Sequence, residues 1–206
     1  MKIRIRRLLL PIFFCLAVAC LIEIPMSQTS LFGDQVILWD TLFRAIAAVP
    51  VLYYFFYQED RVFRGEERFT PASGAGYFFA GFFASAAGSF LIGSLGLSGT
   101  EAANETLLIG PLWLQLIVLL AASPLLEEFF FRGILYMRLK EIVPASAAGI
   151  LSAAAFGLYH GNLAQGIYGF FMGLLLAYAM ERSRTVKAPI LVHIGANLAG
   201  ILLALV

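Results

Sequence analysis

Residues 107–140 read LLIGPLWLQLIVLLAASPLLEEFFFRGILYMRLK, and this stretch decides how the chain folds. As one helix it would be about 50 Å long, because each residue of an α-helix adds about 1.5 Å. The hydrocarbon core of a bilayer is about 30 Å thick, so the stretch predicts a membrane-spanning helix with one end in water. Ser123 and Pro124 mark either a helix start or a kink. If the core begins near residue 108, Glu127 and Glu128 lie near the inner boundary of the membrane.

The composition of the whole chain is that of a membrane protein. Of its 206 residues, 61% are hydrophobic, whereas soluble domains are about 45–50% apolar. We therefore expect an all-α polytopic membrane protein, a bundle of about seven transmembrane helices with a buried polar site in its C-terminal half. The net charge of +1 gives no reason to expect nucleic acid as a partner. Both cysteines, Cys15 and Cys20, fall in the first apolar stretch and predict neither a disulfide framework nor a cysteine zinc site.

Seven apolar segments are predicted to span the membrane. They are residues 8–24, 36–57, 75–97, a segment that begins near 107, and residues 144–159, 163–180 and 189–206. The segment 144–159 is on the short side, and it is expected to form a tight hairpin with the next one. Residues 1–106 would then hold about three N-terminal transmembrane helices, and residues 107–206 a catalytic core of about four spans. Both parts are expected to form a single integral membrane domain.

Basic residues mark one side of the predicted bundle. Lys and Arg precede the first span and follow the second, fourth and sixth, whereas the loops 25–35, 98–106 and 160–162 contain neither. By the positive-inside rule the N-terminus is expected in the cytoplasm. The compact size and basic start favour the cell membrane of a bacterium. Arg44 is outside this pattern and lies four residues after Asp40, so we expect a structural ion pair on one helix face, with a functional relay as the alternative.

The N-terminus also resembles a signal peptide. A basic start and an apolar stretch are followed by Leu16-Ala-Val-Ala-Cys20, a loose lipoprotein-type cleavage box. Cleavage there would remove the first span and separate the N-terminus from the charge pattern, so a retained span is favoured.

The segment Glu127-Glu-Phe-Phe-Phe-Arg132 carries the first polar motif. Glu128 and Arg132 are four residues apart with the acid first, the better orientation for an ion pair on a helix. Glu127 points about 100° away and is left as the freer carboxylate, which burial would make a better general base. The alternative is a paired charge cluster that only marks the membrane interface.

The two histidines of the chain supply the other polar motifs. Phe156 shares a helix face with His160, and His193 shares one with Asn197. Each imidazole can be a helix–helix hydrogen-bonding group, a general base, a metal ligand or an oxyanion donor. The Asn197 amide can donate to an oxyanion or orient His193. These positions conflict in depth, because His160 would lie about 24 Å beyond the predicted inner boundary, so segment 144–159 is tilted, re-entrant or wrongly bounded.

In this order on successive apolar helices, the motifs E-E-x-x-x-R, F-x-x-x-H and H-x-x-x-N resemble the CAAX protease and bacteriocin-processing (CPBP, or Abi) family. This is the family of the type II CAAX prenyl endopeptidase, and the match covers about residues 107–206. The resemblance implies an intramembrane endopeptidase that acts on a membrane-associated or lipidated protein or peptide.

The resemblance also implies roles for individual residues. Glu127 would activate the attacking water with the help of His160, and His193 and Asn197 would stabilise the oxyanion. The supporting residues would be Glu128, Arg132 and Phe156.

A metal is the open question of this site. If zinc or another divalent metal is present, Glu127, His160 and His193 would be its ligands. The chain lacks the H-E-x-x-H helix of most zinc proteases, and a Glu–His base with a His–Asn oxyanion hole needs no metal. A site without a cofactor is therefore favoured.

Two other functions fit a polytopic protein with these residues. One is a non-proteolytic membrane scaffold or bacteriocin-immunity protein of the same fold. The other is a small proton-coupled transporter, which would predict an internal repeat with interrupted helices in both halves. Polar motifs occur only in the second half of this sequence. The expected partners are membrane lipid and a protein or peptide substrate, and no oligomeric state is predicted.

Overall fold

The computed structural model describes residues 2–58, 64–94 and 109–204. Within these ranges the chain forms helices and no β-strand. Six helical segments are long and apolar enough to cross a membrane, and a shorter apolar helix accompanies them. The predicted all-α polytopic membrane fold of about seven helices is confirmed. The loop 98–106 and the division at residue 106 lie outside the described residues, so the two-part division stays a prediction.

The helices follow one another in a simple order. The helices made of a single segment are α1 (Lys2–Ser27), α2 (Val36–Tyr57), α4 (Pro71–Ser94), α9 (Ala145–Tyr159), α10 (Leu163–Ser183) and α11 (Lys187–Ala204). A short 3-10 turn, η1 (Gly33–Gln35), leads into α2. The remaining long helix consists of α6 (Leu112–Ile117), η2 (Val118–Ala122), α7 (Ser123–Glu128), η3 (Phe129–Tyr136) and α8 (Met137–Leu139).

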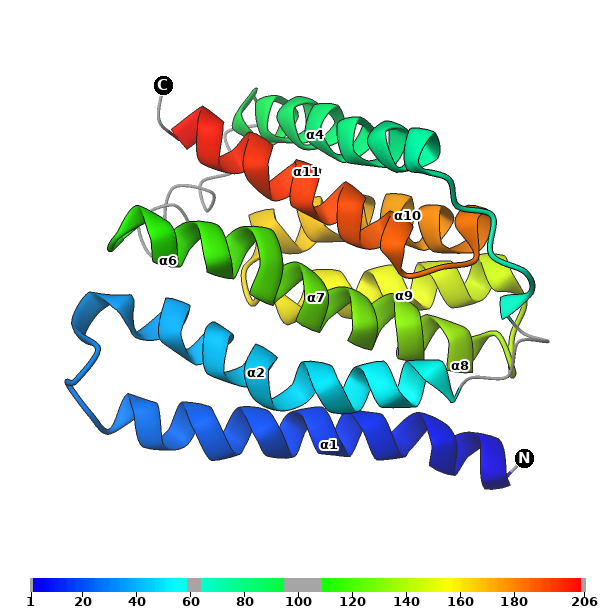
Figure 1. The fold of residues 1–206 in the computed structure, drawn as a ribbon, viewed down its shortest axis with the longest axis horizontal. Coiled ribbons are helices and arrows are strands. Elements are labelled where there is room, and N and C mark those ends of the chain that lie inside the picture. The colour runs from blue at the N-terminus through cyan, green and yellow to red at the C-terminus, as the bar shows by residue number, and fades with distance from the viewer. Residues whose placement is uncertain (1, 59–63, 95–108, 205–206) are drawn as a thin grey trace.

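Figure 1 shows how these helices are layered. At one edge α1 lies against α2, and at the other edge α4 lies against α11. The segment α7, the helix α9 and the helix α10 lie between these two pairs. The polar motifs are on α7, η3, α9 and α11, so the N-terminal helices cover the motif-bearing helices from both sides.

The long helix is widened by two π-helical stretches, η2 and η3. Ser123 and Pro124 follow η2 directly and lie inside the continuous helix rather than at its start. In η2 the N–H of Ser123 bonds to the carbonyl of Val118, five residues earlier. The next such bond would join Pro124 to Leu119, but proline has no N–H. The Leu119 carbonyl is therefore left for a partner outside its own helix.

The short helix α9 removes the conflict in the predicted depths. Glu127 lies near the middle of the 28-residue helix Leu112–Leu139, about 18 Å from its C-terminal end. The 15 residues of α9 start beside that end and span about 22 Å, so His160 caps α9 at a similar depth. The observed bounds of this short helix agree with the predicted segment 144–159.

Two close helix contacts fix α11 and α10. A Cβ atom on Gly81 of α4 would lie 1.9 Å from the Val192 carbonyl oxygen, and one on Gly195 would lie 2.1 Å from the Phe78 carbonyl oxygen. A Cβ atom on Gly157 of α9 would lie 2.5 Å from a backbone oxygen of α10. Small residues let membrane helices approach this closely, so these glycines set the positions of the motif-bearing helices.

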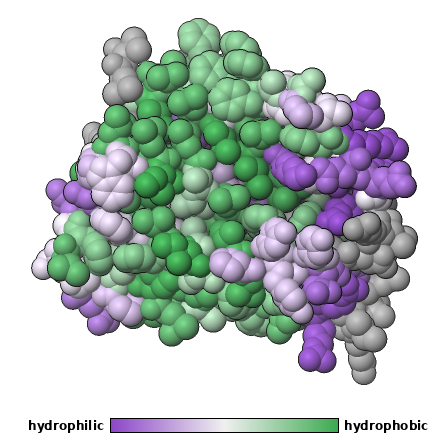
Figure 2. Space-filling model, viewed as in Figure 1, coloured by the Kyte–Doolittle hydropathy of each residue, from purple (hydrophilic) through white to green (hydrophobic). Residues whose placement is uncertain are grey.

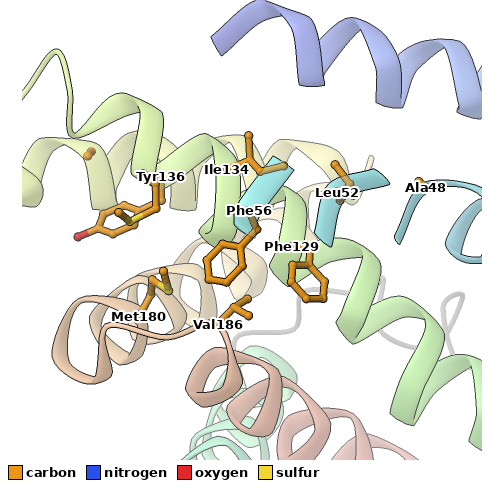
Figure 3. Close-up of a cluster of buried hydrophobic side chains, with 10 residues drawn as sticks. Ala48, Leu52, Phe56, Phe129, Ile134, Tyr136, Met180 and Val186 are labelled. Atoms are coloured by element: carbon orange, nitrogen blue, oxygen red, sulfur yellow. The ribbon is translucent and has the colours of Figure 1, made fainter. Parts of the chain in front are cut away.

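One buried apolar cluster joins α2 to the motif-bearing helices (Figure 3). Its members include Ala48, Leu52, Phe56, Phe129, Ile134, Tyr136, Met180 and Val186. Figure 2 shows an apolar band across the middle of the molecule and a hydrophilic end on the side of the N-terminus. Contacts such as Arg7 with Glu141 and Lys187 with Glu67 join charged segments at this end. The basic segments predicted to share one side of the membrane therefore share one end of the molecule.

Candidate active site

Glu128, Arg132 and His193 form a buried network at the centre of the bundle. Arg132 Nη1 donates to Glu128 Oε1 at 3.1 Å, and both side chains are 0% exposed. This confirms the predicted pair. The Nδ1 atom of His193, on α11, lies 2.7 Å from the same Glu128 oxygen. Because a carboxylate oxygen accepts, Nδ1 carries the hydrogen of this bond, and Nε2 is turned towards the neighbouring carboxylate.

Phe156 completes the surroundings of Arg132. The guanidinium carbon lies 4.2 Å from the Phe156 ring centroid, a cation–π distance, and Nη2 donates to the Gly173 carbonyl at 3.4 Å. The Phe156 ring also meets the His193 ring edge to face, with centroids 5.9 Å apart. Phe156 therefore contacts two members of the network and closes it off from the apolar interior.

Glu127 has the most open carboxylate of the network. Its Oε1 accepts a hydrogen bond of 2.5 Å from Ser123 Oγ, and its Oε2 is buried without a hydrogen-bond partner among the described residues. The second oxygen of Glu128 also lacks a partner, but Glu128 is fully enclosed whereas Glu127 lines a cavity. Glu127 Oε2 and His193 Nε2 are 3.9 Å apart, a separation that one bridging water can span.

The charges of the network balance when His193 is protonated. Glu127 and Glu128 then supply two negative charges, and Arg132 and His193 supply two positive ones. An unbalanced charge is costly in a low-dielectric interior, so the imidazolium form suits a site at this depth. Its Nε2–H is available as a donor on the side that faces Glu127.

His160 belongs to the same site but is held separately. Its Nδ1 lies 2.8 Å from the Phe156 carbonyl oxygen, so Nδ1 donates and Nε2 is left as the acceptor of the neutral ring. The His160 and Phe156 ring centroids are 4.8 Å apart. Phe156 therefore contacts both imidazole rings, and no direct bond joins His160 to Glu127 in the described part of the chain.

Asn197 is fastened to the long helix. Its Nδ2 donates to the Leu119 carbonyl at 2.7 Å, the carbonyl that Pro124 cannot satisfy. The second hydrogen of the amide remains for another acceptor. The π-helical turn and the proline thus explain why an asparagine on α11 meets the helix that carries the two glutamates.

The three candidate metal ligands do not form a ligand set. His193 Nδ1 is bonded to Glu128 and His160 Nδ1 to a carbonyl, which leaves Nε2 of each ring available, as in a metal-ligating histidine. Across residues 2–58, 64–94 and 109–204, no group of three or more His, Cys, Asp or Glu side chains is placed to hold a metal ion. Catalytic zinc needs three protein ligands, so this donor arrangement does not fit it.

A small cavity adds residues that sequence reasoning missed. It has a volume of about 150 Å³ and is lined by Glu127, Arg44, Tyr159 and apolar side chains of α1, α2 and the long helix. Ser123 could have been found from its spacing, because it lies one helical turn before Glu127. Tyr159 carries no such signal, since 115 positions separate it from Arg44, which the sequence pairs only with Asp40.

Two comparisons with known proteins found matches to this chain. Residues 109–199 match the model of a family described as type II CAAX prenyl endopeptidase Rce1-like. A relative from Bacillus subtilis (strain 168), named "Putative membrane peptidase YdiL", is 31% identical over 126 residues, which are 60% of this chain and 51% of the relative. This chain therefore spans about half the length of that relative. No solved structure matches the chain. The segment that carries all three polar motifs thus lies within residues 109–199, the part of the chain that is similar to the Rce1-like family.

Proposed function

We propose that this chain is an intramembrane endopeptidase that hydrolyses a peptide bond of a membrane-associated or lipidated protein or peptide. The observation that carries the proposal is the buried Glu127 Oε2, which has no hydrogen-bond partner among the described residues, faces His193 and belongs to a cavity-lining carboxylate. The family description names a prenyl endopeptidase, so a prenylated C-terminus is one substrate class within the proposal.

In the proposed reaction, a water held between Glu127 Oε2 and His193 Nε2 gives a proton to Glu127. The water oxygen attacks the scissile carbonyl carbon, and negative charge moves to the carbonyl oxygen. The Nε2–H of protonated His193 and the remaining amide hydrogen of Asn197 stabilise this oxyanion. The carbonyl then re-forms as the C–N bond breaks, and Glu127 gives its proton to the leaving nitrogen, so that the products are a carboxylic acid and an amine.

The remaining motif residues have supporting roles in this proposal. Glu128 fixes the ring of His193 and helps to stabilise its charge, while Arg132 balances Glu128 and rests on Phe156. His160 is proposed to assist the water through its free Nε2. The proposal also places the N-terminus and the hydrophilic end in the cytoplasm of a bacterial cell.

The test is a cleavage assay with purified protein in liposomes. A panel of quenched peptides, with and without a C-terminal prenyl-cysteine, is presented to the wild type, to Glu127→Gln and to the control Glu66→Gln. We expect Glu127→Gln to lose at least about 100-fold in kcat, the lower range for general base catalysis, and the exposed control to lose nothing.

A metal chelator in the same assay distinguishes a metal-free mechanism from a zinc-dependent one. Undiminished cleavage with the chelator is expected, because the donor arrangement does not fit zinc. Cleavage lost on chelation and restored by zinc would overturn the metal-free mechanism. Peptides left intact by the wild type would favour a scaffold or immunity protein.

A further inference from the structure

The cavity beside Glu127 reaches helices outside the segment that matches the family. Its wall combines Glu127 with apolar residues of α1, with Arg44 of α2 and with Tyr159 at the end of α9. Most of the lining is apolar, so the polar groups on it find few hydrogen-bond partners within the wall. Arg44 and Tyr159 are the polar side chains of this wall that the proposed mechanism does not use.

Arg44 forms an ion pair with Asp40 and a hydrogen bond with Tyr159. Its Nη2 lies 2.5 Å from Asp40 Oδ2, which confirms the pair predicted from their spacing. Its Nη1 donates to the hydroxyl of Tyr159 at 3.4 Å. The Arg44–Asp40 pair is neutral overall, so its guanidinium serves to direct a hydrogen bond rather than to bring net charge to the cavity.

The hydroxyl of Tyr159 keeps a hydrogen to donate. It accepts from Arg44, and its own hydrogen is directed to the cavity that it shares with Glu127 rather than to a hydrogen bond found among the described residues. The ring is held by Phe131 and His160, at centroid distances of 5.6 and 5.9 Å. A phenol donates as well as it accepts, so a rigid ring with one lone pair engaged presents its hydrogen to whatever occupies the cavity.

We propose that Tyr159 is a substrate-binding donor that hydrogen-bonds a carbonyl oxygen of the bound peptide, and that Arg44, paired with Asp40, is the residue that positions it. The proposal rests on the proposed peptidase function, because the ligand is the peptide that Glu127 acts on. It gives the N-terminal helix α2 a direct part in a site whose motifs all lie beyond residue 109.

The test measures KM and kcat for the quenched peptide that the wild type cleaves fastest. Tyr159→Phe removes one hydroxyl and keeps the ring, so we expect KM to rise about tenfold with kcat unchanged, the effect of one lost hydrogen bond to bound substrate. Tyr178→Phe is the matched control, because that tyrosine lies on α10 and does not line this cavity. It is expected to change neither constant.

A second variant tests the positioning role. Changing Arg44 alone would strand Asp40, so both are changed together, as Asp40→Asn with Arg44→Gln. We expect a smaller rise in KM, about threefold, since the donor remains but is less well held. Added to Tyr159→Phe, the double change should raise KM no further, because residues that act through one another are not additive.

Three results would overturn the inference. The first is an unchanged KM for Tyr159→Phe, which would rule out Tyr159 as a substrate-binding donor. The proposed function would still stand in that case if the wild type cleaves the peptide and Glu127→Gln does not. Additive effects on KM, accompanied by a lower unfolding midpoint in detergent, would show that the pair is only structural. A wild type that cleaves no peptide would overturn the proposed function and this inference together.

Discussion

Two acid–arginine pairs with the same spacing lie in the two halves of the molecule. Glu128 and Arg132 are on the long helix, and Asp40 and Arg44 are on α2. The first pair is 0% exposed and is tied to a histidine and a phenylalanine ring, whereas the side chains of the second are 10% and 18% exposed and reach a tyrosine hydroxyl. Sequence spacing determines which residues form each ion pair. The helices packed against each pair determine which further side chains the pair contacts.

The largest expected effect comes from removing each arginine. Arg132→Met removes one of the two positive charges that balance the buried Glu127 and Glu128, so we expect the free energy of unfolding to fall by about 3–5 kcal/mol, with cleavage lost. Arg44→Met leaves Asp40 without its partner, but Asp40 is already closer to the surface than Glu128. We therefore expect the free energy of unfolding to fall by only about 1–2 kcal/mol. Unfolding in mixed micelles by a denaturing detergent measures both variants.

Equal losses in the two variants would contradict this part of the comparison. Equal losses would mean that the contacts to side chains of other helices, to His193 in the first pair and to Tyr159 in the second, contribute little to the free energy of unfolding. The cation–π contact of Arg132 with Phe156 would then be of minor weight as well.

A smaller effect is expected when only the charge of each acid is removed. Glu128→Gln keeps the side-chain shape but weakens the bond to His193 Nδ1 and the support of its protonated ring. Bonds to charged groups contribute about 1.5–3 kcal/mol, so kcat should fall about 10- to 100-fold. Asp40→Asn, the matched control, leaves Arg44 in reach of Tyr159 and should lower kcat/KM less than about threefold. Steady-state cleavage kinetics check both, and a larger loss in the control would reverse the comparison.

The sequence predicted the parts of this site that depend on local spacing. Both ion pairs, the helical class and the α9–α10 hairpin follow from periodicity, apolar length and short connections. The order of the three motifs was enough to identify the family of residues 109–199. These features are local because each is set within one helix or between neighbours along the chain.

Contacts between distant helices could not be read from spacing. The prediction offered two roles for Asn197, but its amide meets Leu119 because a π-helical turn and Pro124 leave that carbonyl unsatisfied. His193 lies between two carboxylates because α11 meets α4 closely at Gly81 and Gly195. Such contacts depend on how the helices cross, which the pattern of a single sequence does not give.

The smallest effect is expected at a third pair, which extends the comparison to the exposed end of the molecule. Lys187 Nζ lies 2.9 Å from Glu67 Oε1, with the side chains 61% and 46% exposed. Water and salt screen such a pair, so Glu67→Gln should lower the free energy of unfolding by less than about 1 kcal/mol and leave kcat unchanged. The same micelle assay, run at low and high salt, would show any small difference vanish as salt rises. A loss as large as that of Arg132→Met would mean that burial does not rank these pairs, because this pair is the most exposed of the three.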